Sequence, residues 1–132
     1  DLDAFGAAAA LLGFELVRGQ TTHQAYGGRQ PCLHALRIKN PTALQNRLGR
    51  GEQDYEIGIV AAKDEPGCFN LVYDPGMSVS RRLHELGGVN MQRLRQEYAV
   101  QVAMSQLRKA GHRVTRTVNQ KTGRPRVVAL CR

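Results

Sequence analysis

The chain has 132 residues, a hydrophobic fraction of 42% and a formal net charge of +8. This length suits one ordinary domain and is too short for two cores of normal size. The hydrophobic fraction argues against a disordered chain. No run of about 18 apolar residues occurs, as a membrane-spanning helix would need, and the apolar segment Phe5–Leu12 lacks the basic flank of a signal peptide. We therefore expect one domain over residues 1–132, an intracellular and cytoplasmic location, and no contact with a membrane.

The positive charge is concentrated in the second part of the chain. Residues 1–76 contain seven Lys/Arg and nine Asp/Glu, whereas residues 77–132 contain twelve and two, so the two parts carry −2 and +10. A basic half in a small domain predicts a polyanionic partner, either nucleic acid or an acidic protein surface. The alternative is a solvated charged surface that has no partner.

The first part of the chain predicts a short helix followed by strands. Asp1 or Asp3 can cap the helix, and Gly13 follows its last turn. In chain order, the expected elements are a helix over 2–12, a strand over 14–17, a loop over 18–31, a strand over 33–39, a turn region over 40–51 with one helical turn near 43–47, and two strands, 55–61 and 69–73, joined as a hairpin by Pro66-Gly67.

The second part predicts two helices and a closing hairpin. The expected elements are a short helix over 81–86 capped by Ser78 or Ser80, a main helix over 91–110 capped by Asn90, and two strands over 112–118 and 126–131. The apolar arc of the main helix widens toward its C-terminal end, which is typical of a central core helix. Within the first strand of the hairpin, alternation places Val114 and Val118 inward, and Arg113 and Arg116 on opposite faces.

Together these elements predict an α+β fold, in which a mostly antiparallel sheet of hairpins packs against one long C-terminal helix and a short N-terminal helix.

The residues that usually carry chemistry are scattered. Cys32, Cys68 and Cys131 show no C-x-x-C spacing, which predicts buried free thiols rather than disulfides or a zinc site. The histidines form no metal-ligand or catalytic motif, and no glycine-rich phosphate loop occurs; they are His23, His34, His84 and His112. The sequence therefore predicts no catalytic residue, no metal and no cofactor. An enzyme that acts on a small molecule is the least favoured functional hypothesis.

Several short segments occur in an order that resembles one known family. The segments are Tyr55-Glu56-Ile57-Gly58, Phe69-Asn70-Leu71-Val72-Tyr73-Asp74, Leu94-Arg95-Gln96-Glu97-Tyr98-Ala99, Lys109-Ala110-Gly111-His112-Arg113-Val114 and Gly123-Arg124-Pro125-Arg126-Val127-Val128. They resemble the Y-D-I-G, Y-E-L-V-A-D, Q-R-Y-A-Y, K-Q-G-F-x-V and D-G-S-I-R-L-V-V segments of the hypothetical chloroplast reading frame number 35 proteins. This family occurs in red-algal plastids, cyanobacteria and other bacteria.

The resemblance implies a fold and a lineage, and no reaction, because the family has no established activity. It also implies a bacterial or phage-infected cell, or a plastid in the algal relatives. Members often end in Arg-Trp, whereas this chain ends in Cys131-Arg132 and contains no tryptophan. Members also begin with a short segment before the first helix, so we expect an N-terminal strand to be missing from this sequence.

Two functions remain open at this point. The first is a non-enzymatic accessory or interaction protein that docks on a larger assembly, and the second is nucleic-acid binding through contacts with the phosphate backbone. Aromatic residues are not interleaved with the basic ones, so base stacking on single strands is poorly supported. The candidate contacts with an anion or nucleic acid are Arg81, Arg82, Arg93, Arg113, Arg116, Lys121, Arg124 and Arg126.

Overall fold

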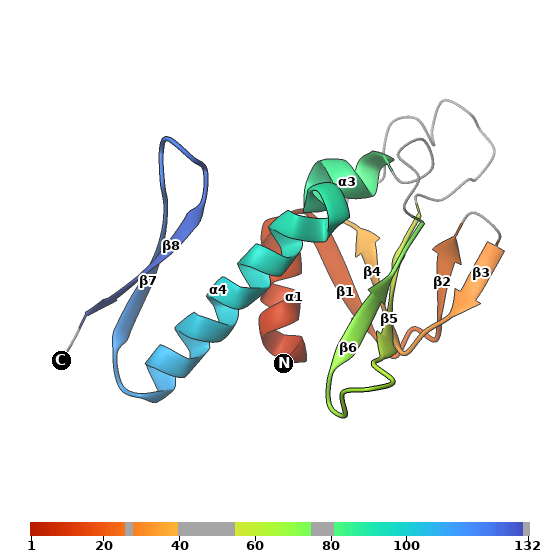
Figure 1. The fold of residues 1–132 in the computed structure, drawn as a ribbon, viewed down its shortest axis with the longest axis horizontal. Coiled ribbons are helices and arrows are strands. Elements are labelled where there is room, and N and C mark those ends of the chain that lie inside the picture. Colours follow the sequence, from red (N-terminus) through yellow and green to blue (C-terminus); the bar gives the residue numbers. More distant parts are fainter. Residues whose placement is uncertain (26–27, 40–54, 75–80, 131–132) are drawn as a thin grey trace.

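The computed structural model describes residues 1–25, 28–39, 55–74 and 81–130 (Figure 1). The elements are α1 (Leu2–Leu11), β1 (Phe14–Arg18), β2 (Thr22–Ala25), β3 (Gly28–Pro31), β4 (His34–Ile38), β5 (Ile57–Ala61), β6 (Phe69–Val72), α3 (Arg81–Gly87), the 3-10 turn η1 (Val89–Met91), α4 (Gln92–Lys109), β7 (Arg113–Val118) and β8 (Pro125–Leu130). The predicted α+β class is confirmed. The helical turn expected near 43–47, the Ser78 or Ser80 cap and Cys131 lie outside the described residues.

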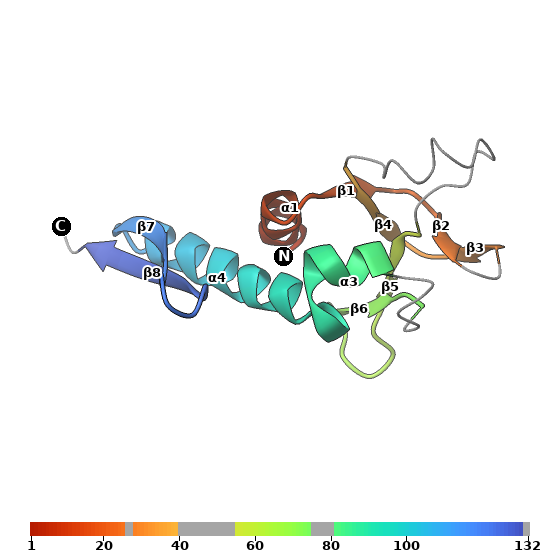
Figure 2. The same ribbon diagram turned by 90° about the horizontal axis from the view of Figure 1, so that it is seen from above.

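The main sheet has four antiparallel strands in the order β1-β4-β5-β6. Figures 1 and 2 show α1, α3 and the first half of α4 gathered on one side of it. The side chains that fill this interface are Ala8, Ala9, Phe14, Leu36, Ile38, Ile57, Ile59, Leu83, Met91 and Leu94. Removal of this apolar area from water is the main force that holds the sheet and helices together. No helix among the described residues is long and apolar enough to cross a bilayer.

A second hairpin, β2–β3, occupies most of residues 18–31, so the loop predicted there is wrong. Its register pairs Thr22 with Pro31 and Ala25 with Gly28. The hairpin contacts β4 and β5. Ile57 and Ile59 face the helices, so Gly58 between them faces the other side of the sheet, because side chains alternate along a strand. Gly58 lies against His23 of β2, so the hairpin covers the face opposite the helices. The sequence pattern does not reveal these strands because they bury a histidine and an alanine, His23 and Ala25, rather than large aliphatic side chains.

The helix ends agree with the sequence at α1 and differ at α4. The Asp1 carboxylate accepts hydrogen bonds from the N–H groups of Asp3 and Ala4, at 3.0 and 3.1 Å, and therefore caps α1 as expected. Asn90 does not cap α4. Asn90 and Met91 both have left-handed backbone conformations, with φ of 54° and 55°, and no side chain caps the helix. This tight connection buries the Met91 side chain completely between α3 and α4.

The main helix is a core helix over only part of its length. Leu94 is fully buried against the sheet, as the apolar pattern predicted. In residues 99–109, however, only Met104 is buried. Figure 2 shows this second half of α4, with the β7–β8 hairpin beside it, extending away from the sheet. The prediction of a central core helix is therefore wrong for the C-terminal half of α4.

Replacement of Gly58 by alanine should destabilise the protein. A Cβ atom at this position would lie 2.4 Å from Nδ1 of the buried His23, so the β2–β3 hairpin would have to move, at a cost of about 1–3 kcal/mol. Urea unfolding of G58A measures this loss. The matched control is Gly6→Ala in α1, where a Cβ would lie at 3.4 Å from a Leu16 methyl group and should stabilise the helix by about 0.5–1 kcal/mol. Equal effects of the two substitutions would contradict the close contact.

Candidate functional site

The projecting part of the molecule carries a concentrated positive charge. We call residues 99–130, the second half of α4 and the β7–β8 hairpin, the basic arm. They include seven Lys/Arg and no Asp or Glu. Because the whole chain has a net charge of +8, the basic arm accounts for nearly all of its excess. Such a charge density needs either an anionic partner or a solvent-exposed surface.

The two faces of the β7–β8 hairpin differ in composition. The antiparallel register pairs Arg113 with Leu130, Thr115 with Val128 and Thr117 with Arg126, and all six side chains are exposed. We call this set the outer face. The inner face, toward α4, contains half-buried Val114, Arg116 and Val127. The outer face therefore combines aliphatic, hydroxyl and guanidinium groups and contains no carboxylate.

The predicted inward direction of Val114 agrees with its partial burial, and Arg113 and Arg116 do lie on opposite faces. Val118 shares the parity of Val114 but is 41% exposed, because it lies at the end of β7 next to the turn. Val128 and Leu130, on the outer face, are 36% and 55% exposed. Aliphatic side chains this exposed are unusual when several lie on one small hairpin, and they mark the hairpin as a candidate contact surface.

An ion pair between a buried carboxylate and a half-buried guanidinium fixes the hairpin on the helix. Glu97 of α4 is only 3% exposed, and its carboxylate accepts two hydrogen bonds from the Arg116 guanidinium of β7; the Nε–Oε2 distance is 3.1 Å. The same hydrogen bonds raise the pKa of Arg116 above its usual value. Bidentate Arg–carboxylate pairs are geometrically specific, so this pair sets both the distance and the rotation of β7 relative to α4.

The hairpin turn is ordered by one side chain. The amide oxygen of Asn119 accepts hydrogen bonds from the N–H groups of Lys121 and Thr122, at 2.9 and 3.2 Å. Gly123 then takes the left-handed conformation, with φ of 71°, which glycine adopts without strain. The side chains of Lys121 and Arg124 are exposed on this turn.

The structure gathers half of the eight predicted anion contacts and separates the rest. Arg113, Lys121, Arg124 and Arg126 are exposed on the hairpin. Arg116 faces inward and is paired with Glu97. Arg93 lies in the first turn of α4, with Nη1 at 3.4 Å from the Glu85 carbonyl oxygen, and Figure 1 shows the β7–β8 hairpin beside the opposite end of α4. Arg81 and Arg82 begin α3. The eight residues therefore do not form one patch.

A second polar cluster lies beneath the β2–β3 hairpin, and the sequence pattern did not reveal it. The carboxylate of Glu56, 7% exposed, accepts a hydrogen bond from the Gln24 N–H at 2.8 Å and from the Gln20 side chain at 3.2 Å, and it lies 3.6 Å from the Arg29 guanidinium. The Glu56 N–H also donates to the Gln24 carbonyl at 2.9 Å. These bonds attach the hairpin to β5 and use the carboxylate as a structural anchor.

His23 is buried beside this cluster. Burial lowers the pKa of its imidazole, and the nearby carboxylate of Glu56 opposes this effect. Its Nδ1 atom has no hydrogen-bond partner among the described residues. A neutral imidazole is therefore favoured in the folded protein.

The described residues contain no cluster of three His, Cys, Asp or Glu side chains that could hold a metal ion. Cys32 and Cys68 are free thiols, as predicted. Cys32 is half-buried and burial raises the pKa of its thiol, whereas Cys68 is exposed, so the prediction of burial is wrong for Cys68. His34 accepts a hydrogen bond from the Gly19 N–H at 3.0 Å, and the buried His84 meets Tyr73 edge to face.

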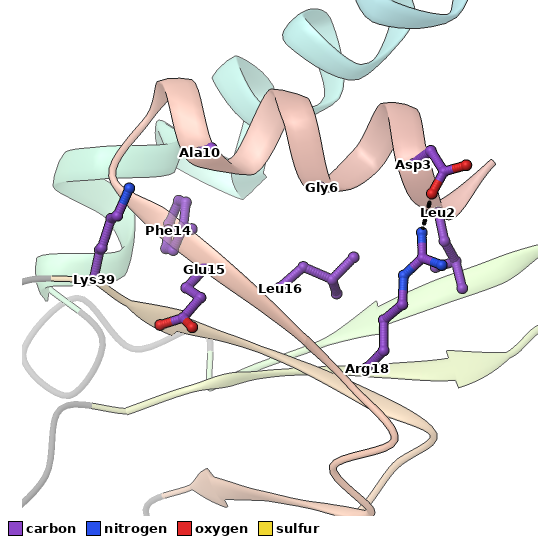
Figure 3. A pocket seen from close by; sticks show the side chains of 9 residues that line it. All are labelled: Leu2, Asp3, Gly6, Ala10, Phe14, Glu15, Leu16, Arg18 and Lys39. Carbon is purple, nitrogen blue, oxygen red and sulfur yellow. Dashed lines mark hydrogen bonds and ion pairs between the residues drawn. The ribbon is translucent and has the colours of Figure 1, made fainter.

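Within the described part of the chain, a groove lies along each edge of the main sheet. The groove between α1 and β1 has a volume of about 540 Å³. Figure 3 shows Arg18 reaching across it to Asp3, with the apolar Leu16 further along the strand; the Arg18–Asp3 distance is 2.5 Å. The groove beside β6 has a volume of about 430 Å³ and is lined by α1, β6 and α4.

Comparison with known protein families, curated proteins and solved structures finds no match to this chain. The resemblance to the chloroplast reading frame number 35 proteins therefore stays a prediction.

Loss of Arg116 should destabilise the protein strongly. The Arg116→Leu substitution leaves the buried Glu97 carboxylate without its guanidinium partner. Breaking a fully buried pair costs about 3–5 kcal/mol, and because the Arg116 side chain is 28% exposed, we expect a loss at or below the lower end of this range. The double variant E97L/R116L should recover most of this loss, because an apolar pair can replace a buried ion pair at little cost. Urea unfolding of both variants measures the difference. If E97L/R116L were as unstable as R116L, the unpaired carboxylate would not be the cause.

The stability should fall as the pH falls through the titration of His23. Because the folded pKa is lowered, the unfolded chain takes up a proton near pH 6.5 while the folded protein does not, and the free energy of unfolding decreases as the pH drops below that value. Urea unfolding at pH 7 and pH 5 measures this loss. The His23→Asn variant should lose less stability over the same interval, and an identical loss in both proteins would contradict the assignment.

Proposed function

We propose that this protein is a non-enzymatic accessory protein that docks on a larger assembly through the outer face of its basic arm. The observation that carries the proposal is the composition of that face. Exposed Val128 and Leu130 follow Arg126 along one side of β8, Arg113 lies opposite Leu130, and residues 99–130 contain no carboxylate. Aliphatic side chains next to arginine side chains are a common combination in protein interfaces.

The charge of the arm indicates the partner's surface. Two copies of the arm would place cations against cations, so a second copy of this chain is a poor partner for it. A partner with an apolar depression and an acidic margin would bury the aliphatic side chains and pair with the guanidinium groups. The projection of the arm from the sheet (Figure 2) would allow it to enter such a depression while the rest of the protein stays outside.

Nucleic-acid binding is the second candidate, and one observation favours it. The outer face carries Arg113 and Arg126 together with the hydroxyl groups of Thr115 and Thr117. A two-stranded ribbon can enter the major groove of a duplex, where arginine and hydroxyl side chains contact phosphates and base edges. The same arginine side chains would contribute to protein docking and to nucleic-acid binding, whereas the aliphatic side chains would contribute mainly to a protein interface.

Two arm variants separate the candidates. V128T/L130T removes exposed apolar groups, places β-branched threonine, which suits a strand, at both positions, and keeps all the charge. R113E/R126E lowers the net charge from +8 to +4, and the matched control K39E/K63E makes the same change at exposed residues outside the arm. Each tagged protein is used to capture its partner from the source cells, and each is titrated with labelled duplex DNA and single-stranded RNA at about 50 mM salt, where phosphate contacts are strongest.

A protein partner should be recovered by the wild type and by K39E/K63E. Both arm variants should lower its recovery about tenfold or more, since burial of one Val or Leu side chain contributes about 1.5–3 kcal/mol. Recovery of the same partner by both arm variants would contradict docking through the outer face. If R113E/R126E instead abolished binding to nucleic acid and V128T/L130T retained it, the second candidate would replace the first. An absence of binding at about 50 mM salt would remove the second candidate.

A further inference from the structure

The two edges of the main sheet are protected to different degrees. An edge strand exposes unpaired N–H and C=O groups, and proteins usually guard it with charged residues, proline, bulges or a covering element. β1, at one edge, carries Glu15 and Arg18. Glu15 pairs with Arg37 at 3.1 Å, and Arg18 pairs with Asp3 of α1 (Figure 3). These ion pairs are a guard of the expected kind.

The β6 edge has no such guard among the residues that the structure describes. Its four residues, Phe-Asn-Leu-Val, include no charge and no proline. β5 pairs with one side of β6, and no described strand pairs with the other (Figure 1). Phe69 and Val72 are 41% and 42% exposed. An apolar, uncharged edge is a template for another strand.

The hydrogen-bond pattern shows which groups face the free side. The Ala62 N–H donates to the Cys68 carbonyl at 3.0 Å, so residues 62 and 68 are a hydrogen-bonded pair. Such pairs alternate along an antiparallel ladder, which makes Val60–Asn70 the next one in the β5–β6 register. The N–H and C=O groups of Phe69 and Leu71 therefore point away from β5, toward the free edge.

An open groove lies along the same edge. Ile59, Phe69 and Leu71 share the helix-facing side of the sheet, and with Phe5 of α1 and Tyr98 of α4 they line its apolar part. Phe5 and Tyr98 meet edge to face, with ring centroids 5.7 Å apart. The groove would receive alternate side chains of a strand paired with β6, because alternate side chains of an added strand point to the same face.

We propose that the β6 groove is a docking site for an extended segment of a partner protein, which adds to the main sheet as a fifth strand. The segment pairs with the main chain of Phe69 and Leu71 and places alternate apolar side chains between α1 and α4. Arg95 lines the same groove as Asp1 and Glu65 but forms an ion pair with no described residue, so an acidic residue of the segment placed beside Arg95 would complement it. In recognition of this type, hydrogen bonds to the main chain of the edge strand supply the affinity, and pockets for alternate side chains supply the specificity.

The test uses a fluorescein-labelled peptide of about six residues, a usual strand length, with alternating valine and threonine and a glutamate at one end. Fluorescence anisotropy measures its binding, and amide hydrogen exchange followed by NMR locates it. Exchange at the N–H groups of Phe69 and Leu71 should slow about tenfold or more on binding, as hydrogen-bonded amides are protected. The N–H of Asn70, already directed toward β5, should change little.

A matched pair of variants tests the role of the main chain. Phe69→Pro removes one outward N–H at the first position of an edge strand, where proline is tolerated. F69A removes the same aromatic ring and keeps the N–H. F69P should bind the peptide about tenfold more weakly than F69A, while both retain the circular dichroism spectrum of the wild type. R113E/R126E should bind it like the wild type, which separates this site from the basic arm.

Equal binding by F69P and F69A, or unchanged exchange at Phe69 and Leu71, would overturn the proposal. Protection of these amides that rises with protein concentration in the absence of peptide would also overturn it, because the occupant would then be a second copy of this chain.

Discussion

The ion pair between Glu97 and Arg116 determines which side chains of the β7–β8 hairpin face away from α4. Glu97 is buried on α4, and an unpaired carboxylate is too costly to keep there. Arg116 must therefore point toward the helix. Because side chains alternate along β7, this direction places Arg113, Thr115 and Thr117 on the opposite face. The register with β8 then adds Arg126, Val128 and Leu130. A slip of one residue would exchange the two faces and leave Glu97 without its partner.

The regular elements could be predicted because their patterns are local. The apolar alternation of 55–61 and 113–118 predicted β5 and β7, and Asp1 and Gly13 marked the ends of α1. β2–β3 could not be predicted in this way, because its strands have few large apolar side chains. Glu56 alternates with isoleucines and would face solvent if nothing covered that side of the sheet. It is buried only because β2–β3 lies over it, and this depends on contacts between residues 32 positions apart.

The candidate site was predictable in composition but not in geometry. The charge count located the basic residues, and strand parity separated Arg113 from Arg116. Strand parity could not show that Arg116 is paired with a residue on the preceding helix, because this pairing depends on the orientation of the hairpin on α4. The widening apolar arc of α4 predicted full burial, yet most of residues 99–109 are only half-buried or exposed. Apolar residues that the fold does not fully cover are the expected composition of a surface that another molecule covers.

The basic arm and the β6 groove would select their partners by different forces. The arm carries only positive charge, so its association should depend on ionic strength and on the partner's acidity. The groove contains both Arg95 and Glu65, so charge there supports a single contact with an acidic residue of the segment, and the main chain of β6 supplies most of the affinity. α4 connects the two surfaces, since Tyr98 lines the groove and Lys109 ends the helix. These residues are separated by 11 positions, or about 17 Å along the helix axis. A standard interface of about 800 Å² per partner is roughly 30 Å across, so the groove and the end of α4, where the basic arm turns into its hairpin, lie within the span of one interface.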